Sequence, residues 1–71
     1  MKIKIGFETI QDYLEFIDEE LITILENDAS DVDFEDQMMC VVLEFKATPD
    51  VATLRSIEDT VKIHGGVMSN E

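Results

Sequence analysis

The sequence predicts a single acidic α+β domain spanning residues 1–71, in which two helices pack on a small sheet of three to four strands. Strand-like segments alternate apolar and polar residues, whereas two helix-like segments repeat apolar residues at spacings of three and four. A hydrophobic content of 45% excludes simple disorder even at a net charge of −12. A chain of this length buries only about 60% of its unfolded surface, so its stability is expected to be small or shared with a partner.

Up to four segments are expected to form the sheet. Met1–Phe7 alternates apolar and polar residues, which is typical of a strand. Val32–Phe34 is a candidate for a short edge strand. Met38–Lys46 contains the continuous apolar run Val41–Leu43, which is typical of a central strand. Val67-Met68 is a candidate for a last short strand.

Two helices are expected between these strands. The first begins at Thr9, spaced from Asp12 as in a capping box, and ends near Glu26. The second begins with Thr48 as its N-cap and ends at Gly65 in the left-handed conformation. The residues expected on the buried faces are Ile10, Tyr13, Leu14, Ile17, Leu21, Ile24 and Leu25 in the first helix, and Val51, Leu54, Ile57, Val61 and His64 in the second. The order β-α-(β)-β-α, with an optional last strand, is similar to a trimmed ferredoxin-like fold, which by itself indicates no function.

Charge is segregated along the chain. Between Gly6 and Phe45 the sequence has thirteen acids and no Lys or Arg, and all five bases lie outside that stretch. Nucleic-acid phosphates and anionic membranes would repel such a chain, so direct binding to either is not expected. Self-repulsion of this kind destabilises a compact fold, and a function is therefore expected to favour it.

The first helix is expected to carry a row of carboxylates. On an ideal helix, Glu8, Asp12, Glu15, Glu19 and Glu26 fall within about 60° of arc, opposite the apolar face. Their spacing of about one charge per 5 Å approaches the 3.4 Å per phosphate of a DNA strand. An ordinary solvated helix face is the alternative interpretation.

Two apolar residues, Phe16 and Ile22, project from the margins of this row. They either pack beneath the segment 27–37 or serve as exposed apolar anchors inside an acidic rim, as in a protein-binding hot spot. The residues assigned to partner binding are Glu8, Asp12, Glu15, Phe16, Asp18, Glu19, Glu20, Ile22, Glu26, Asp28, Asp31, Asp33, Glu35 and Asp36.

The base-free, acid-rich segment Glu8–Asp36 on a small α+β frame resembles the phage-encoded DNA-mimic proteins that disable host DNA-binding proteins. Among these, it is most similar in size and charge to Bacillus-phage host-takeover proteins that inhibit the nucleoid protein HU. The resemblance is one of charge pattern and size and has no invariant motif. It implies an inhibitor in the bacterial cytosol that occludes the basic DNA-binding surface of an HU-like partner.

Two other classes of function remain open. One is an acidic antitoxin or adaptor-type module that binds a basic protein without mimicking DNA. The other is a small domain whose charge serves solubility only. A homodimer is expected, because the core is marginal at this length, and Val42 with the strand Met38–Lys46 is expected to bury surface against a second copy.

Other motifs point to little further chemistry. Asp31-x-Asp33-x-Glu35 lacks the Gly and the final Glu of an EF-hand, which leaves only loose binding of Ca²⁺ or Mg²⁺ as an option. Cys40 has no companion for an internal disulfide, which suits a reducing cytosol, and His64 is expected at the core edge or as a helix cap. No nucleophile–base–orienter set can be assembled, so neither an enzyme nor a cofactor is expected. The chain start lacks a signal-peptide core, and no apolar run would span a membrane.

Overall fold

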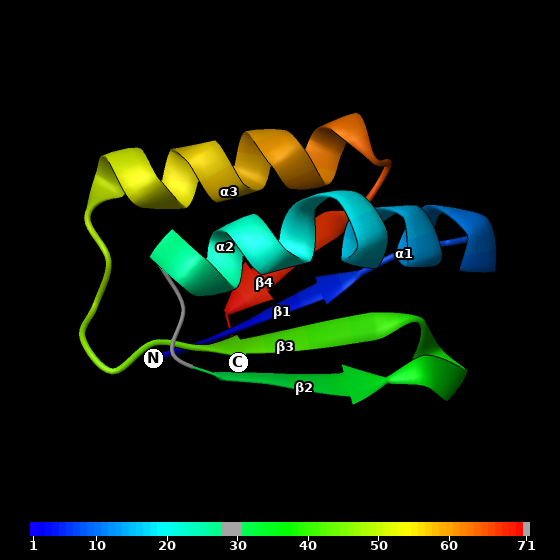
Figure 1. The fold of residues 1–71 in the computed structure, drawn as a ribbon, viewed down its shortest axis with the longest axis horizontal. Coiled ribbons are helices and arrows are strands. Elements are labelled where there is room, and N and C mark those ends of the chain that lie inside the picture. The colour runs from blue at the N-terminus through cyan, green and yellow to red at the C-terminus, as the bar shows by residue number, and fades with distance from the viewer. Residues whose placement is uncertain (28–30, 71) are drawn as a thin grey trace.

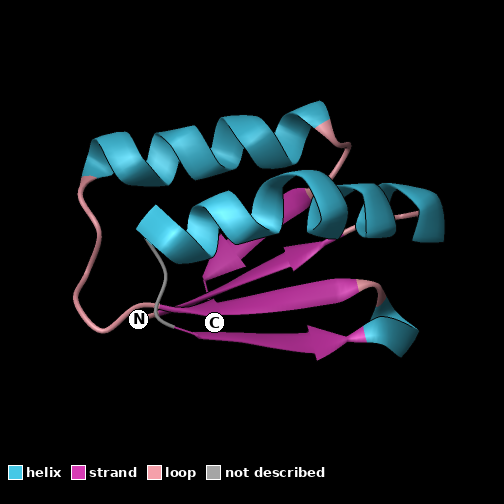
Figure 2. Cartoon of the chain, in the orientation of Figure 1, coloured by secondary structure: helices cyan, strands magenta, loops and turns pink. Residues whose placement is uncertain are grey.

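The computed structural model describes residues 1–27 and 31–70. Its helices form one layer over a single face of the sheet (Figures 1 and 2). In chain order the elements are β1 (Lys2–Gly6), α1 (Ile10–Phe16), the π-helix η1 (Ile17–Leu21), α2 (Ile22–Asn27), β2 (Asp31–Glu35), the 3₁₀-helix η2 (Asp36–Met38), β3 (Cys40–Glu44), α3 (Val51–Ile63) and β4 (Val67–Asn70).

The sheet has the strand order β2-β3-β1-β4, and each neighbouring pair is antiparallel. With helices between β1 and β2 and between β3 and β4, this is the ferredoxin-like β-α-β-β-α-β arrangement. The predicted α+β fold is therefore confirmed. Both optional strands form, so the sheet has four strands and the fold is not trimmed.

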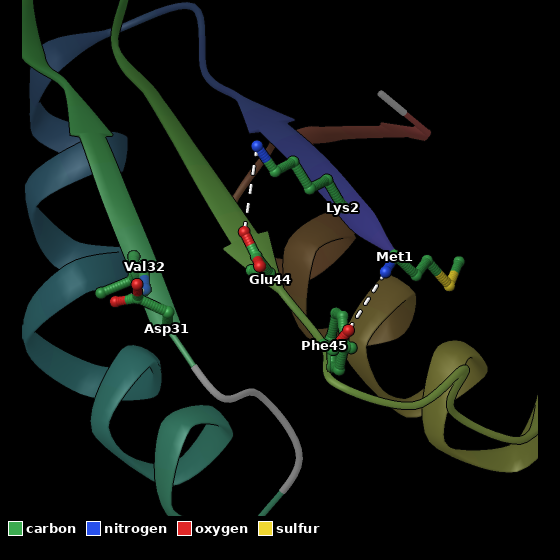
Figure 3. Close-up of polar contacts among 6 residues, drawn as sticks. All are labelled: Met1, Lys2, Asp31, Val32, Glu44 and Phe45. Carbon is green, nitrogen blue, oxygen red and sulfur yellow. Dashed lines mark hydrogen bonds and ion pairs between the residues drawn. The ribbon is translucent and has the colours of Figure 1, made fainter.

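The core lies between the sheet and the helices. Alternation along β1 and β3 directs Ile3, Ile5, Val41 and Leu43 toward the helices, where all four are fully buried. The chain start is held to the end of β3 by two hydrogen bonds. The terminal ammonium of Met1 donates to the carbonyl of Phe45 at 3.1 Å (Figure 3), and the amide of Phe45 donates to the carbonyl of Met1 at 2.8 Å. The predicted alternation in the first strand is thus confirmed.

The first helical segment is not one regular α-helix, and this changes which residues it buries. Tyr13 and Phe16 form the buried face of α1, and Leu21 continues it. Leu21 lies five residues after Phe16, which is the i→i+5 spacing of a π-turn. Ile10 and Leu14, which were expected in the core, are instead 53% exposed.

Two predicted boundaries are wrong, the start of the second helix and the start of the third strand. Helix α3 begins at Val51, after the N-cap Asp50, whose carboxylate accepts from the amide of Thr53 at 2.8 Å, rather than at Thr48. As a first-turn residue, Val51 is exposed and not part of the core. Strand β3 begins at Cys40, because η2 and the left-handed Met39 (φ 53°) occupy the residues before it. The predicted stop at Gly65 is confirmed by its φ of 75°.

The expected contribution of Val42 to a homodimer surface is also wrong. Strand β3 is an internal strand, with β2 on one side and β1 on the other, so both of its hydrogen-bonding edges are occupied. The side chain of Val42 is itself buried within one copy, at 7% exposure. Little of its surface remains for a second copy to cover.

Candidate protein-binding surface

The acids of the first helical segment lie on or beside three consecutive short helices. Glu8 precedes α1 and therefore does not belong to the helical row predicted for it. Along this segment the exposed acids are Glu8, Glu15, Asp18, Glu19 and Glu26, and the half-buried ones are Asp12 and Glu20.

One flank of the helical segment is acidic and faces the C-terminal end of α3. Glu19 and Glu20 each direct a carboxylate oxygen at Nε2 of His64, at 3.7 and 3.4 Å. The imidazole of His64 is largely buried and meets Phe16 edge-on, with 5.9 Å between ring centroids. Asp12 lies beside Gly65, which follows α3, because a Cβ placed on Gly65 would be 3.4 Å from Oδ2 of Asp12. We call Asp12, Glu19 and Glu20 the acidic flank.

The opposite flank is apolar. Asp12 and Glu20 each precede a buried residue, Tyr13 or Leu21, and point toward α3. Leu14 and Ile22 each follow one of those buried residues. Successive residues lie about 100° apart around a helix axis, so these two side chains point to the side of the helix opposite Asp12 and Glu20, away from α3. Ile10 lies four residues before Leu14 and shares its face. We call Ile10, Leu14 and Ile22, which are 53%, 53% and 63% exposed, the apolar flank.

Strand β2 runs along the same side of the molecule as the apolar flank. In Figures 1 and 3 the α1–α2 segment lies toward the β2 edge of the sheet, whereas α3 lies toward β1 and β4. Val32 and Phe34 pair with the core residues Leu43 and Val41, so they point to the helix-covered face. Val32 packs against the core, but Phe34 remains 49% exposed beside the helices.

The three carboxylates of β2 point to the other, uncovered face of the sheet. Asp31 and Asp33 are exposed, and Glu35 is half-buried, with an oxygen 3.6 Å from Nζ of Lys4. The register pairs Asp33 with Val42 of β3, which confirms their common face. The carboxylate of Asp31 also accepts a hydrogen bond of 2.8 Å from the amide of Val32 (Figure 3). Strand β2 is thus acidic on one face and apolar on the other.

Asp36 has a structural contact of its own. The hydroxyl of the buried Tyr13 donates to its Oδ1 at 2.6 Å, which ties α1 to η2. Burial, and then the hydrogen bond to this carboxylate, raise the pKa of Tyr13 well above its ordinary value. Asp36 remains exposed and keeps part of its surface for solvent or a partner.

Phe16 is not a partner contact, contrary to the prediction. It is fully buried and packs against Phe7, with 5.2 Å between ring centroids. The expected alternative, packing beneath the segment 27–37, involves residues outside the described ones. The other marginal residue, Ile22, is exposed and remains a candidate. Asp28 lies outside the described residues.

On this side of the molecule, sequence reasoning missed the exposure of three apolar residues, Ile10, Leu14 and Phe34. A signal for the first two was present. On an ideal helix the apolar residues from Phe16 round to Leu14 cover an arc of about 160°, wider than the roughly 100° stripe a core needs. For Phe34 the predicted edge position of Val32–Phe34 did not settle its exposure, because that also depends on how far the helices cover the edge of the sheet.

Among residues 1–27 and 31–70, no group of three or more His, Cys, Asp or Glu side chains is arranged to hold a metal ion. Within the same residues no helix is long and apolar enough to cross a membrane. The thiol of Cys40 is buried and donates to the carbonyl of Met38 at 3.2 Å. Comparison with protein-family models, with curated proteins and with solved structures found no match for this chain.

Proposed function

We propose that this protein inhibits a basic DNA-binding protein by occupying its DNA-binding surface, with an HU-type nucleoid protein as the most plausible target. The observation that carries the proposal is the stretch from Gly6 to Phe45, which has thirteen acids and no base. Two nearby lysines, Lys2 and Lys4, lie within ion-pair distance of Glu44 and Glu35, at 3.9 and 3.6 Å. With thirteen acids in this stretch and five Lys and Arg residues in the whole sequence, basic side chains of the same chain are too few to neutralise most of these carboxylates.

The dimensions of the molecule support competition with DNA. Its longest extent of 30 Å corresponds to about nine phosphates of one DNA strand at 3.4 Å each. Exposed carboxylates occur on the helical layer and on the uncovered face of β2, so more than one side of the molecule presents negative charge. Such a field accelerates encounter with a basic surface and weakens as salt rises.

A band-shift competition tests the proposal. An HU-type protein bound to a labelled duplex should release free DNA as this protein is added, and release should require more protein at higher salt. This protein alone should leave the duplex unshifted. Direct DNA binding, or a stable complex of all three components, would contradict the proposal.

The second candidate, an antitoxin or adaptor that binds a basic protein without mimicking DNA, is favoured by one observation. Phosphates offer no counterpart to the apolar flank or to Phe34, which together expose four large apolar side chains. Apolar contacts are insensitive to ionic screening. Partner binding that persists at high salt and leaves DNA bound to that partner would favour this candidate over the mimic.

A further inference from the structure

We infer that the outer edge of β2 binds an extended segment of the partner as an additional strand, and that this segment alternates basic and apolar residues. The inference deepens the proposed function and rests on its basic protein partner, but it does not require competition with DNA. Its basis is the juxtaposition of an edge strand, a row of carboxylates and the apolar flank.

Strand β2 has an edge that a fifth strand can pair with. It is the first strand in the order β2-β3-β1-β4, and its register with β3 runs without interruption from Asp31 to Glu35. Natural edge strands are usually protected by lysine, proline or a bulge. The segment Asp31–Glu35 has none of these three, and its charged side chains are carboxylates, which repel an acidic strand but attract a basic one.

The backbone of β2 offers donors along this edge. The amide of Val32 donates to the Asp31 carboxylate, so it points away from β3. Backbone groups alternate in direction along a strand, and the amide of Phe34 therefore points the same way. Carbonyl oxygens of an added strand would accept from these two amides and displace the Asp31 carboxylate from the first.

The side chains of β2 specify what the added strand must carry. Directly opposed residues on one sheet face have Cβ atoms about 4.5–5.5 Å apart, close enough for an ion pair. Basic residues on the uncovered face would meet Asp31, Asp33 and Glu35. The intervening apolar residues would point to the helix-covered face and cover Phe34 and the apolar flank. Lys4 already contacts Glu35 on this face, which shows that the row accepts a cation.

A second copy of the chain is a poor occupant of this edge. Two β2 strands paired with each other would bring their carboxylate rows together, and like charges directly opposite each other destabilise a strand pair. Each copy also carries a net charge of −12. The acidic row thus protects the edge against self-association while it attracts a cationic strand.

Titration with synthetic peptides, followed by NMR and hydrogen exchange, tests the inference without DNA. One peptide alternates arginine and valine, a second has the same composition with its arginines grouped at one end, and a third alternates glutamate and valine. The alternating basic peptide should shift the Val32 and Phe34 amide resonances and slow their exchange. The grouped peptide should bind more weakly, and the acidic peptide should not bind.

Charge-reversal variants locate the contact. Asp33→Lys, at the centre of the row, should weaken binding of the alternating basic peptide by roughly tenfold. Asp59→Lys is the matched control, because it makes the same change in net charge at an exposed site on α3, and its loss should be small. Asp33→Asn is a milder variant that should show a smaller loss in the same direction.

Three results would overturn the inference: equal losses from the two lysine variants, equal affinity for the grouped peptide, or binding that leaves the β2 amides unprotected. The two proposals fail separately. Release of DNA from HU without peptide binding at β2 would contradict only the inference that β2 binds an added strand. Protection of β2 by the peptide without release of DNA would remove the DNA-mimic function and leave the strand-binding edge.

Discussion

Tyr13 joins two parts of the chain that are far apart in sequence. Its buried hydroxyl donates to Asp36 in η2, and the raised pKa of Tyr13 reflects first its burial and then this carboxylate. A raised pKa means that the fold favours the neutral phenol. The stability that the neutral phenol contributes is therefore complete at pH values below the pKa of tyrosine in the unfolded chain, about 10, and is lost as pH rises above it.

We predict that Tyr13→Phe lowers the free energy of unfolding by about 1 kcal/mol at neutral pH, because the exposed Asp36 carboxylate can be rehydrated. Urea denaturation measures this change. At pH above about 10 the parent should lose stability more steeply than the variant. Since Tyr13 is the only tyrosine, tyrosinate absorbance should rise together with unfolding of the parent. Ionisation of the phenol in the still-folded protein would contradict this prediction.

Gly66 is required by close packing. A Cβ at this position would lie 2.6 Å from Cε1 of the buried Phe7 ring and 2.9 Å from Cγ1 of Val61. Both neighbours belong to the core and have little room to move. We predict that Gly66→Ala destabilises the protein by about 1–3 kcal/mol in urea denaturation. Gly6→Ala is the control, because among the described residues the atom nearest to its Cβ would be Cys40 Sγ, at 3.4 Å, and its effect should be clearly smaller.

At the scale of elements, the π-helix η1 determines which residues form the acidic flank and which form the apolar flank of the helical segment. The five-residue step from Phe16 to Leu21 keeps apolar residues on the core face and leaves Glu20 at its border, against His64. The same step aligns Leu14 with Ile22 on the other side. A single irregular turn thereby separates an acidic flank from an apolar one.

Glu15 and Glu19 lie four residues apart on this segment, and both are exposed. Like charges at that spacing destabilise a helix by about 0.2–0.5 kcal/mol. We predict that the double change Glu15→Gln and Glu19→Gln raises the melting temperature slightly and weakens binding to an HU-type target at low salt. Thermal unfolding and calorimetric titration at two salt concentrations measure the two effects. Asp59→Asn on α3 is the control for removal of an exposed acid elsewhere. Unchanged affinity of the double variant would exclude these two carboxylates from the contact.

For the whole molecule, the proposed homodimer needs a surface other than β3. Strand β4 is the second edge of the sheet, its residues Val67–Asn70 are uncharged, and Val67 is exposed. Pairing of two β4 strands would extend the sheet and keep the acidic β2 edges apart.

We predict that self-association occurs through β4 and strengthens with salt, because screening reduces the repulsion between two chains of charge −12. Sedimentation equilibrium at two salt concentrations measures this, and Val67→Lys should weaken the dimer. The matched control Ile63→Lys changes another exposed apolar residue, outside β4, and should have little effect. A monomer at both salt concentrations would contradict the prediction.

The local features of the fold could be predicted from the sequence. Alternation in β1, the cap at Thr9, whose hydroxyl accepts from the amide of Asp12 at 3.2 Å, and the glycine stop at Gly65 each depend on residues within a few positions of one another. The excess of acids over bases, which carries the proposed function, is likewise a property of composition. These features need no knowledge of what packs against them.

Only the tertiary structure decided which candidate residues face solvent. Phe16 is buried because Phe7, which follows β1, and His64, at the end of α3, pack against it. Leu14 is exposed because no described element covers that side of α1. The exposure of Phe34 likewise depends on how far the helices cover the sheet edge at β2, since the predicted edge position alone did not settle it. Periodicity records how a helix or strand is divided into faces, but which face is covered depends on contacts between segments distant in sequence, and these form only when the whole chain folds.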